Sequence, residues 1–253
     1  MEKMLDQLIA YLLNEKKEYR GMHIPDSFDE KFRLYRSLVN VRMPNPIDDA
    51  FLELQNTFLK EYSLRKGIVT FQDMEEINDH IYLWKGDITR LQVDAIVNAA
   101  NAQMLGCFVP CHGCIDNAIH TFAGIQLRNE CAEIMKEQGK AEPCGSAKIT
   151  NAYNLPCRYI IHTVGPIVYG SFNHTHEQQL ASCYHAVLQM ALNYELSSIA
   201  FCCISTGEFH FPHEAAARIA VDCVKEFLKT HEMKVIFNVF KQEDETIYRR
   251  LLS

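Results

Sequence analysis

Apolar residues in the first 72 positions recur every three or four residues, the spacing that places them on one face of an α-helix. A first helix is predicted at the start of the chain. A second follows the capping-box pair Ser27 and Glu30, and a third follows Asp48 or Asp49. Prolines separate the three segments, and no cluster of reactive side chains stands out in them. Residues 1–72 are therefore predicted to form a helical N-terminal extension that packs against the rest of the chain or covers it.

The pattern changes after Gly67, where short runs of apolar and β-branched residues alternate with helical segments. The predicted strands are 81–84, 95–99, 147–152, 159–163, 199–205 and 234–240, and the predicted helices are 115–138, 176–194, 213–230 and a short one from 243. This alternation is typical of an α/β protein with a mostly parallel or mixed sheet. Residues 73–253 are predicted to form that second domain.

Composition and charge narrow the class of protein. The 253 residues include 25 basic and 32 acidic side chains, a formal net charge of −7. No basic run is present, so nucleic acid is not expected as the main partner, because binding to a phosphate backbone requires clustered positive charge. No apolar run approaches the roughly 18 residues that cross a membrane, and the start of the chain lacks the features of a signal peptide. We therefore expect a cytoplasmic protein, in which a cluster of its ten cysteines indicates metal binding or chemistry.

Three polar segments follow predicted strands, at the edge where open α/β sheets bind ligands. They are Gly86–Thr89, Asn98–Asn101 and Ile204–Phe209. Glycine lets a backbone approach a ligand, and the N–H groups of a turn before a helix can surround a phosphate. The two asparagine amides can bind hydroxyl groups. Taken alone, each segment is common, and Asp87 by itself is typical of a turn or a cap.

A fourth segment gathers cysteine and histidine. Cys107, Cys111, His112 and Cys114 lie within eight positions. A single buried cysteine is often a small hydrophobic residue, and a single histidine is more often structural than a ligand. Four such side chains in one short loop are better explained by a metal ion. Thiolate and imidazole ligands favour zinc over magnesium or calcium.

The order and spacing of GDIT, NAAN, IIHTVGP and ISTGEFHFP resemble those of macrodomains, from about residue 75 to the C-terminus. The resemblance implies a three-layer α/β/α fold with a mixed central sheet, which binds ADP-ribose and in many members hydrolyses its bond to protein. It also implies a set of binding residues, namely Asp87 and the Ile88 N–H at adenine, Asn101 at the distal ribose with Asn98 beside it, Ser205, Thr206, Gly207, Glu208 and Phe209 around the diphosphate, and Phe240 stacked on adenine. For Phe240, burial in the core is the alternative.

The cysteine-containing loop stands where many macrodomains have a run of glycines. It resembles the zinc-dependent members linked with microbial sirtuin-type ADP-ribosyltransferases, which also carry a helical N-terminal extension. Their pattern implies Cys107, His112 and Cys114 as ligands of Zn2+. Cys111 is an additional thiol, and a fourth ligand stays open, although adjacent residues have difficulty reaching one ion together. Asp116 matches the aspartate that many hydrolytic members use, and its alternative role is a favourable charge at a helix start.

The predicted function is the zinc-assisted removal of mono-ADP-ribose from modified protein side chains, with Asp116 and Asn101 as catalytic residues. ADP-ribose and ADP-ribosylated protein are the expected partners, together with a sirtuin-type ADP-ribosyltransferase system. Three alternatives are a reader that binds without cleaving, a deacetylase of O-acetyl-ADP-ribose, and a structural zinc domain. Two residues depart from the macrodomain pattern. His210 stands where glycine is common, and Glu208 adds negative charge near phosphates, so we expect its side chain to turn outward or toward the ribose.

Overall fold

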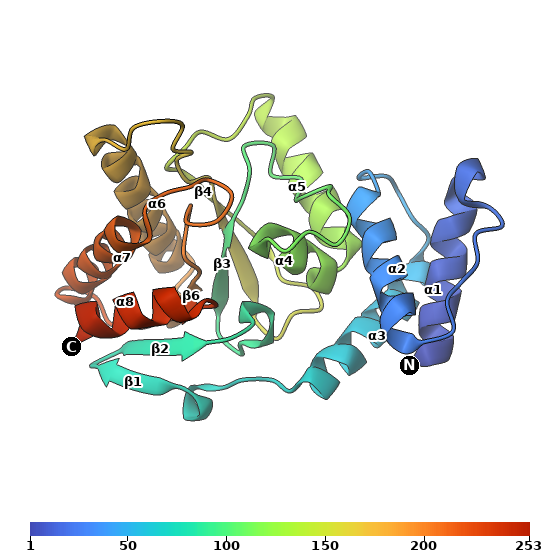
Figure 1. The fold of residues 1–253 in the computed structure, drawn as a ribbon, viewed down its shortest axis with the longest axis horizontal. Coiled ribbons are helices and arrows are strands. Elements are labelled where there is room, and N and C mark those ends of the chain that lie inside the picture. Colours follow the sequence, from blue (N-terminus) through green and yellow to red (C-terminus); the bar gives the residue numbers. More distant parts are fainter.

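The computed structural model describes residues 1–253 and contains a seven-stranded mixed β-sheet with helices on both faces (Figure 1). The sheet order is β1-β2-β7-β6-β3-β5-β4. The strands are β1 Glu75–Asn78, β2 Ile81–Lys85, β3 Ala95–Ala99, β4 Ala147–Asn151, β5 Tyr159–Thr163, β6 Ser198–Phe201 and β7 Lys234–Val239. Only the edge strands β1 and β4 run antiparallel to their neighbours. The loops that follow the five inner strands therefore leave the sheet at one edge.

Two groups of helices cover the sheet. Helices α4 (Ile115–Ala123) and α5 (Ile125–Gln138) pack on one face, and α6 (His174–Asn193), α7 (His213–Leu228) and α8 (Gln242–Leu252) pack on the other. The 49 buried apolar residues of this three-layer unit form one core. The predicted α/β/α fold with a mixed sheet is confirmed. None of the helices combines the length and the apolar character that crossing a membrane requires.

The N-terminal extension is a bundle of three helices, α1 (Glu2–Glu15), α2 (Phe28–Val41) and α3 (Asp49–Lys66), with a separate core of 12 buried apolar residues. The predicted caps are present, since Ser27 and Asp48 accept hydrogen bonds from the first turns of α2 and α3. The bundle lies beside α4 and α5 (Figure 1). Phe122 of α4 stacks against Phe32 and Tyr62 of the bundle, with ring centroids 6.0 and 5.9 Å apart.

Three elements differ from the sequence-based predictions. The single helix predicted over 115–138 is broken at Gly124, whose φ of +98° is unfavourable for other residues and where a Cβ would clash with the side chains of Gln126, Gln55 and Asn154. Strand β1 was missed because its residues, apart from Ile77, are polar and its edge position leaves them mostly exposed. The strand predicted over 199–205 ends at Phe201, and the rest is a loop.

Candidate active site

The predicted site residues gather where the inner strands end. Asp87 follows β2, the Asn98–Asn101 segment ends β3, and Phe240 follows β7. The loop 202–212 leaves β6 at the same edge. This arrangement forms a common binding region from segments far apart in the sequence, as open α/β sheets do.

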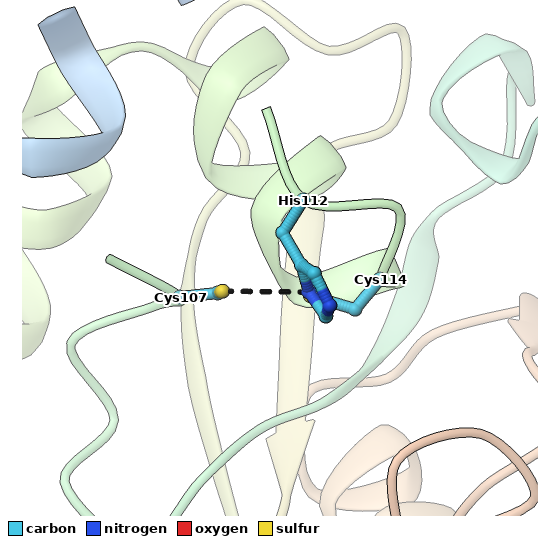
Figure 2. Close-up of side chains that lie close together, drawn as sticks. All are labelled: Cys107, His112 and Cys114. Carbon is cyan, nitrogen blue, oxygen red and sulfur yellow. Dashed lines mark hydrogen bonds between the residues drawn. The ribbon is translucent and has the colours of Figure 1, made fainter. Parts of the chain in front are cut away.

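Three of the four clustered cysteine and histidine side chains converge. Cys107, His112 and Cys114 come from the segment between β3 and α4, which we call the ligand loop (residues 106–114), and Figure 2 shows them pointing toward one another. Their ligand atoms all lie within 4.8 Å of one another, and Cys107 Sγ is 3.6 Å from His112 Nδ1. All three residues are half-buried. Burial raises the pKa of the Cys114 thiol to about 12.

This donor set fits a zinc ion. A thiolate sulfur and an imidazole nitrogen bound to one tetrahedral zinc lie roughly 3.6 Å apart, given bond lengths of about 2.3 and 2.0 Å. The separation of Cys107 Sγ and His112 Nδ1 has this value. Cys111 is not in the group, because its backbone has a φ of +54° and its Sγ donates to the Arg33 carbonyl at 3.3 Å. The geometry therefore favours three protein ligands, with Cys111 turned toward the N-terminal extension.

Asp116 lies in the first turn of α4, two residues after Cys114. Its carboxylate is 5% exposed and accepts hydrogen bonds from Asn98 Nδ2 at 2.8 Å and Asn101 Nδ2 at 3.4 Å. Burial raises the pKa of this carboxyl to about 6, although the amide donors oppose the rise. Asn98 itself is fully buried and also contacts His162 Nδ1 at 3.1 Å. The structure thus places Asn98 behind Asp116 and out of contact with solvent.

A second group of metal-capable side chains lies in the core behind Asp116. His120, Cys131 and His162 are all buried, with ligand atoms within 4.8 Å of one another. Burial, together with the charges of His162 and Arg128, keeps the pKa of His120 well below its ordinary value. The positive charge of the Arg128 guanidinium disfavours a metal cation at this position. We therefore interpret the three side chains as neutral residues of the core. No sequence motif indicates this group, because its three residues lie on three different elements.

The adenine end of the predicted site includes Lys66, a residue that the sequence did not indicate. Asp87 accepts from the Thr89 hydroxyl at 2.6 Å and pairs with Lys66 Nζ at 2.5 Å, from the last turn of α3. Burial favours a higher pKa for Asp87, but the bonds from Lys66 and Thr89 outweigh it and the pKa is lowered. Ile88 is buried, whereas Phe240 is 76% exposed. The alternative that Phe240 belongs to the core is therefore wrong, and its ring is free to meet a ligand.

The predicted diphosphate segment forms a loop that we call the cleft loop (residues 205–210). Ser205 and His210 have φ values of +65° and +55°, so His210 adopts the backbone conformation that glycine favours. Gly207 and Glu208 are exposed, and Thr206 and Phe209 are half-buried. Glu208 turns outward, as expected, and its Oε1 lies 3.6 Å from His112 Nε2. The cleft loop and the ligand loop therefore approach each other at these two side chains.

The fold and the site define an α/β/α protein whose polar loop segments gather at the carboxyl ends of its inner strands, with a metal-capable loop beside them. The family model described as "Macro domain" matches residues 97–220. A Treponema medium protein named "Protein-ADP-ribose hydrolase" is 50% identical over 252 residues, covering 97% of each chain. A Staphylococcus aureus protein (strain MSSA476) of the same name is 45% identical and covers 98% of this chain and 95% of its own.

Solved structures agree with this match. The Oceanobacillus iheyensis macrodomain with ADP has a TM-score of 0.64 at 37% identity, covering 71% of this chain and 93% of its own. The Trypanosoma brucei macrodomain in complex with ADP-ribose has a TM-score of 0.67 at 31% identity, covering 86% and 95%. The chain belongs to the macrodomain family.

Proposed function

We propose that this macrodomain is a protein-ADP-ribose hydrolase that releases mono-ADP-ribose from modified protein side chains, with Zn2+ held by Cys107, His112 and Cys114. The relatives from Treponema medium and Staphylococcus aureus carry the name of that activity over almost their whole length. The observation that carries the proposal is the position of Asp116. Its buried carboxylate lies two residues from a ligand cysteine and contacts the amide of Asn101.

We propose that ADP-ribose lies across the carboxyl ends of the strands. Asp87 would accept from the adenine amino group beside the Ile88 N–H, and the exposed ring of Phe240 would stack on the base. The cleft loop would surround the diphosphate through the backbone of Ser205, Thr206, Gly207, Glu208 and Phe209. This direction of binding brings the distal ribose to Asn101 and the ligand loop.

The proposed reaction adds water across the bond between C1″ of the distal ribose and the protein side chain. The hydroxyl goes to C1″ and the proton goes to the released side chain. Asn101 would hold the ribose, and the Asp116 carboxylate would orient the attacking water and accept its proton. Bound zinc would supply Lewis-acid chemistry beside the ribose. Thiolate ligands require reduced cysteines, so we expect this activity in a reducing compartment such as the cytoplasm, with a sirtuin-type ADP-ribosyltransferase as the source of modified protein.

A turnover assay tests the proposal. Mono-ADP-ribosylated protein is incubated with the full chain, with the chain treated with a chelator, and with the treated chain resupplied with Zn2+. We expect release of ADP-ribose, loss of release on chelation with a near-native circular dichroism spectrum, and recovery with zinc. Binding without release would identify a reader, and release only from O-acetyl-ADP-ribose would identify a deacetylase. Unchanged release from a folded, zinc-free chain would show that the metal has no catalytic role.

A further inference from the structure

Arg36 of helix α2 reaches from the N-terminal extension into the ligand loop. Its Nη2 donates to the backbone carbonyl of His112 at 2.7 Å. The same guanidinium donates to Asn117 Oδ1 through Nη2 at 2.7 Å and Nε at 3.1 Å. The Arg36 side chain therefore holds both the backbone of His112, a proposed zinc ligand, and the side-chain amide of Asn117. Asn117 lies three positions after Cys114, another proposed ligand.

Asn117 extends this contact to the other two ligands. Its side chain is fully buried, and its Nδ2 donates to the carbonyls of Val109 at 3.0 Å and Cys107 at 3.4 Å. Its backbone N–H donates to Cys114 Sγ at 3.4 Å. Arg36 and Asn117 together thus contact all three of Cys107, His112 and Cys114, although neither residue has a side chain in the ligand group.

Asn40 lies one helical turn after Arg36, on the same face of α2. It is 1% exposed, its Oδ1 accepts from the Cys111 N–H at 2.9 Å, and its Nδ2 donates to Thr121 Oγ1 of α4 at 3.0 Å. Cys111 directly precedes the ligand His112 and has a φ of +54°, a conformation that is unfavourable for a residue with a Cβ. The bond from Asn40 stabilises that conformation from outside the loop.

We propose that Arg36 and Asn40 are positioning residues that hold the ligand loop in its ion-binding conformation, so that the N-terminal extension is part of the metal centre. The inference rests on the proposed zinc site. The planar guanidinium of Arg36 presents fixed donors to two acceptors at once, whereas a lysine would keep the charge without this geometry. Contacts of this kind around metal ligands change metal affinity by about 10–100-fold when they are removed.

The direction in which zinc affinity changes when Arg36 is replaced distinguishes a positioning role from two other roles. A positive charge beside a cation site opposes binding, so an Arg36 that acted through charge alone would, when removed, leave tighter zinc binding. An Arg36 that served only the stability of the fold would change the melting temperature and leave zinc affinity unchanged. A positioning Arg36 would, when removed or replaced by lysine, leave weaker zinc binding.

The experiment measures the affinity of the full chain for Zn2+ by competition with a chromophoric chelator, in Arg36→Ala, Arg36→Lys and Asn40→Ala. Arg33→Ala is the matched control, because Arg33 lies on the same helix with an exposed side chain. The affinity for ADP-ribose and the circular dichroism spectrum are recorded for each variant. We expect zinc affinity to fall about 10–100-fold in the Arg36 and Asn40 variants, with ADP-ribose affinity and the Arg33 variant unchanged.

Two results would overturn the inference in distinguishable ways. If the wild-type chain takes up no zinc, the proposed metal site fails and the positioning role fails with it. If the wild-type chain binds zinc and Arg36→Lys binds it equally well or more tightly, only the positioning role fails. Arg36→Lys keeps the charge and the aliphatic stem of the side chain. If Arg36→Ala does not fold, the zinc affinity of Arg36→Lys therefore tests the positioning role.

Discussion

The ligand loop and the cleft loop approach each other at His112 and Glu208, yet they are held in different ways. The ligand loop is bonded by side chains outside itself, from α2 and α4. The cleft loop is held mainly by local backbone bonds, such as His210 N–H to the Gly207 carbonyl and Phe211 N–H to the Ser205 carbonyl, both at 3.0 Å, with one tertiary bond from the Val168 N–H to the Phe209 carbonyl at 2.9 Å. The ligand loop is thus fixed mainly by side chains of other elements, and the cleft loop mainly by a local turn.

This difference matches what each loop is proposed to hold. A metal ion needs several ligand atoms fixed in place, and such precision comes from supporting contacts around the ligands. A diphosphate can be met by backbone N–H groups of a short turn that adjusts to it. Changes on the ligand-loop side should therefore alter zinc binding or turnover, and changes on the cleft side should alter ADP-ribose affinity. The predictions below test that division, from the largest effect to the smallest.

The largest effect is expected at Asp116. Asp116→Ala should slow release of ADP-ribose by about 10²–10⁴-fold, the usual contribution of a general acid or base, while zinc content and ADP-ribose affinity stay near wild type. Single-turnover kinetics with metal analysis of the same sample measures both. Asp116→Asn is the control for packing, because it keeps the size of the side chain and should be equally slow. Normal turnover in the asparagine variant would remove Asp116 from the chemistry.

A smaller effect is expected at the proposed adenine end, and it concerns the affinity for ADP-ribose and not the rate of release. Asp87→Ala should weaken ADP-ribose binding by about 1.5–3 kcal/mol, the value of a hydrogen bond to a charged acceptor, and should leave zinc affinity unchanged. Calorimetry with ADP-ribose gives the affinity. The exposed Asp79 in the β1–β2 turn provides the matched control, since Asp79→Ala removes the same charge away from the cleft. A loss of zinc in the Asp87 variant would contradict the division between the two sides.

The smallest effect concerns the backbone of the cleft loop. His210→Gly should raise the free energy of unfolding by up to about 1 kcal/mol, because glycine adopts the positive φ of this position without a steric cost. Urea denaturation measures the change. His210→Ala keeps the Cβ and should give no gain. A destabilised glycine variant would show that the imidazole makes a contact that outweighs the backbone conformation.

Local patterns allowed much of the fold to be predicted. The caps at Ser27 and Asp48 and the strand Ala95–Ala99 follow from residues adjacent in sequence, and the structure has them where they were expected. The break at Gly124 was missed because α4 and α5 continue one apolar pattern, whereas a Cβ at this position would come into close contact with Gln126, Gln55 and Asn154. Such a contact is set by the tertiary structure, and no local pattern reports it.

The candidate site shows the same limit. The proposed ligands Cys107, His112 and Cys114 lie in one loop, so their spacing alone suggested a metal. Arg36 lies 76 residues before His112, and Lys66 lies 21 residues before Asp87. Both belong to helices on which a basic side chain is normally solvated, and only the packing of α2 and α3 brings them to the ligand loop and to Asp87. Residues that support a site through tertiary contacts carry no motif of their own.

The bond between the Cys111 N–H and Asn40 Oδ1 makes one backbone proton a reporter on the whole N-terminal bundle. That proton can exchange with solvent only when α2 separates from the ligand loop or the loop itself unfolds. Its exchange rate therefore records how often the contact between the bundle and the ligand loop opens, through either movement. If the protection of Cys111 equals that of the sheet, the bundle and the macrodomain open as a single cooperative unit. If it is lower, the proposed metal centre is lost in partial openings long before the molecule unfolds.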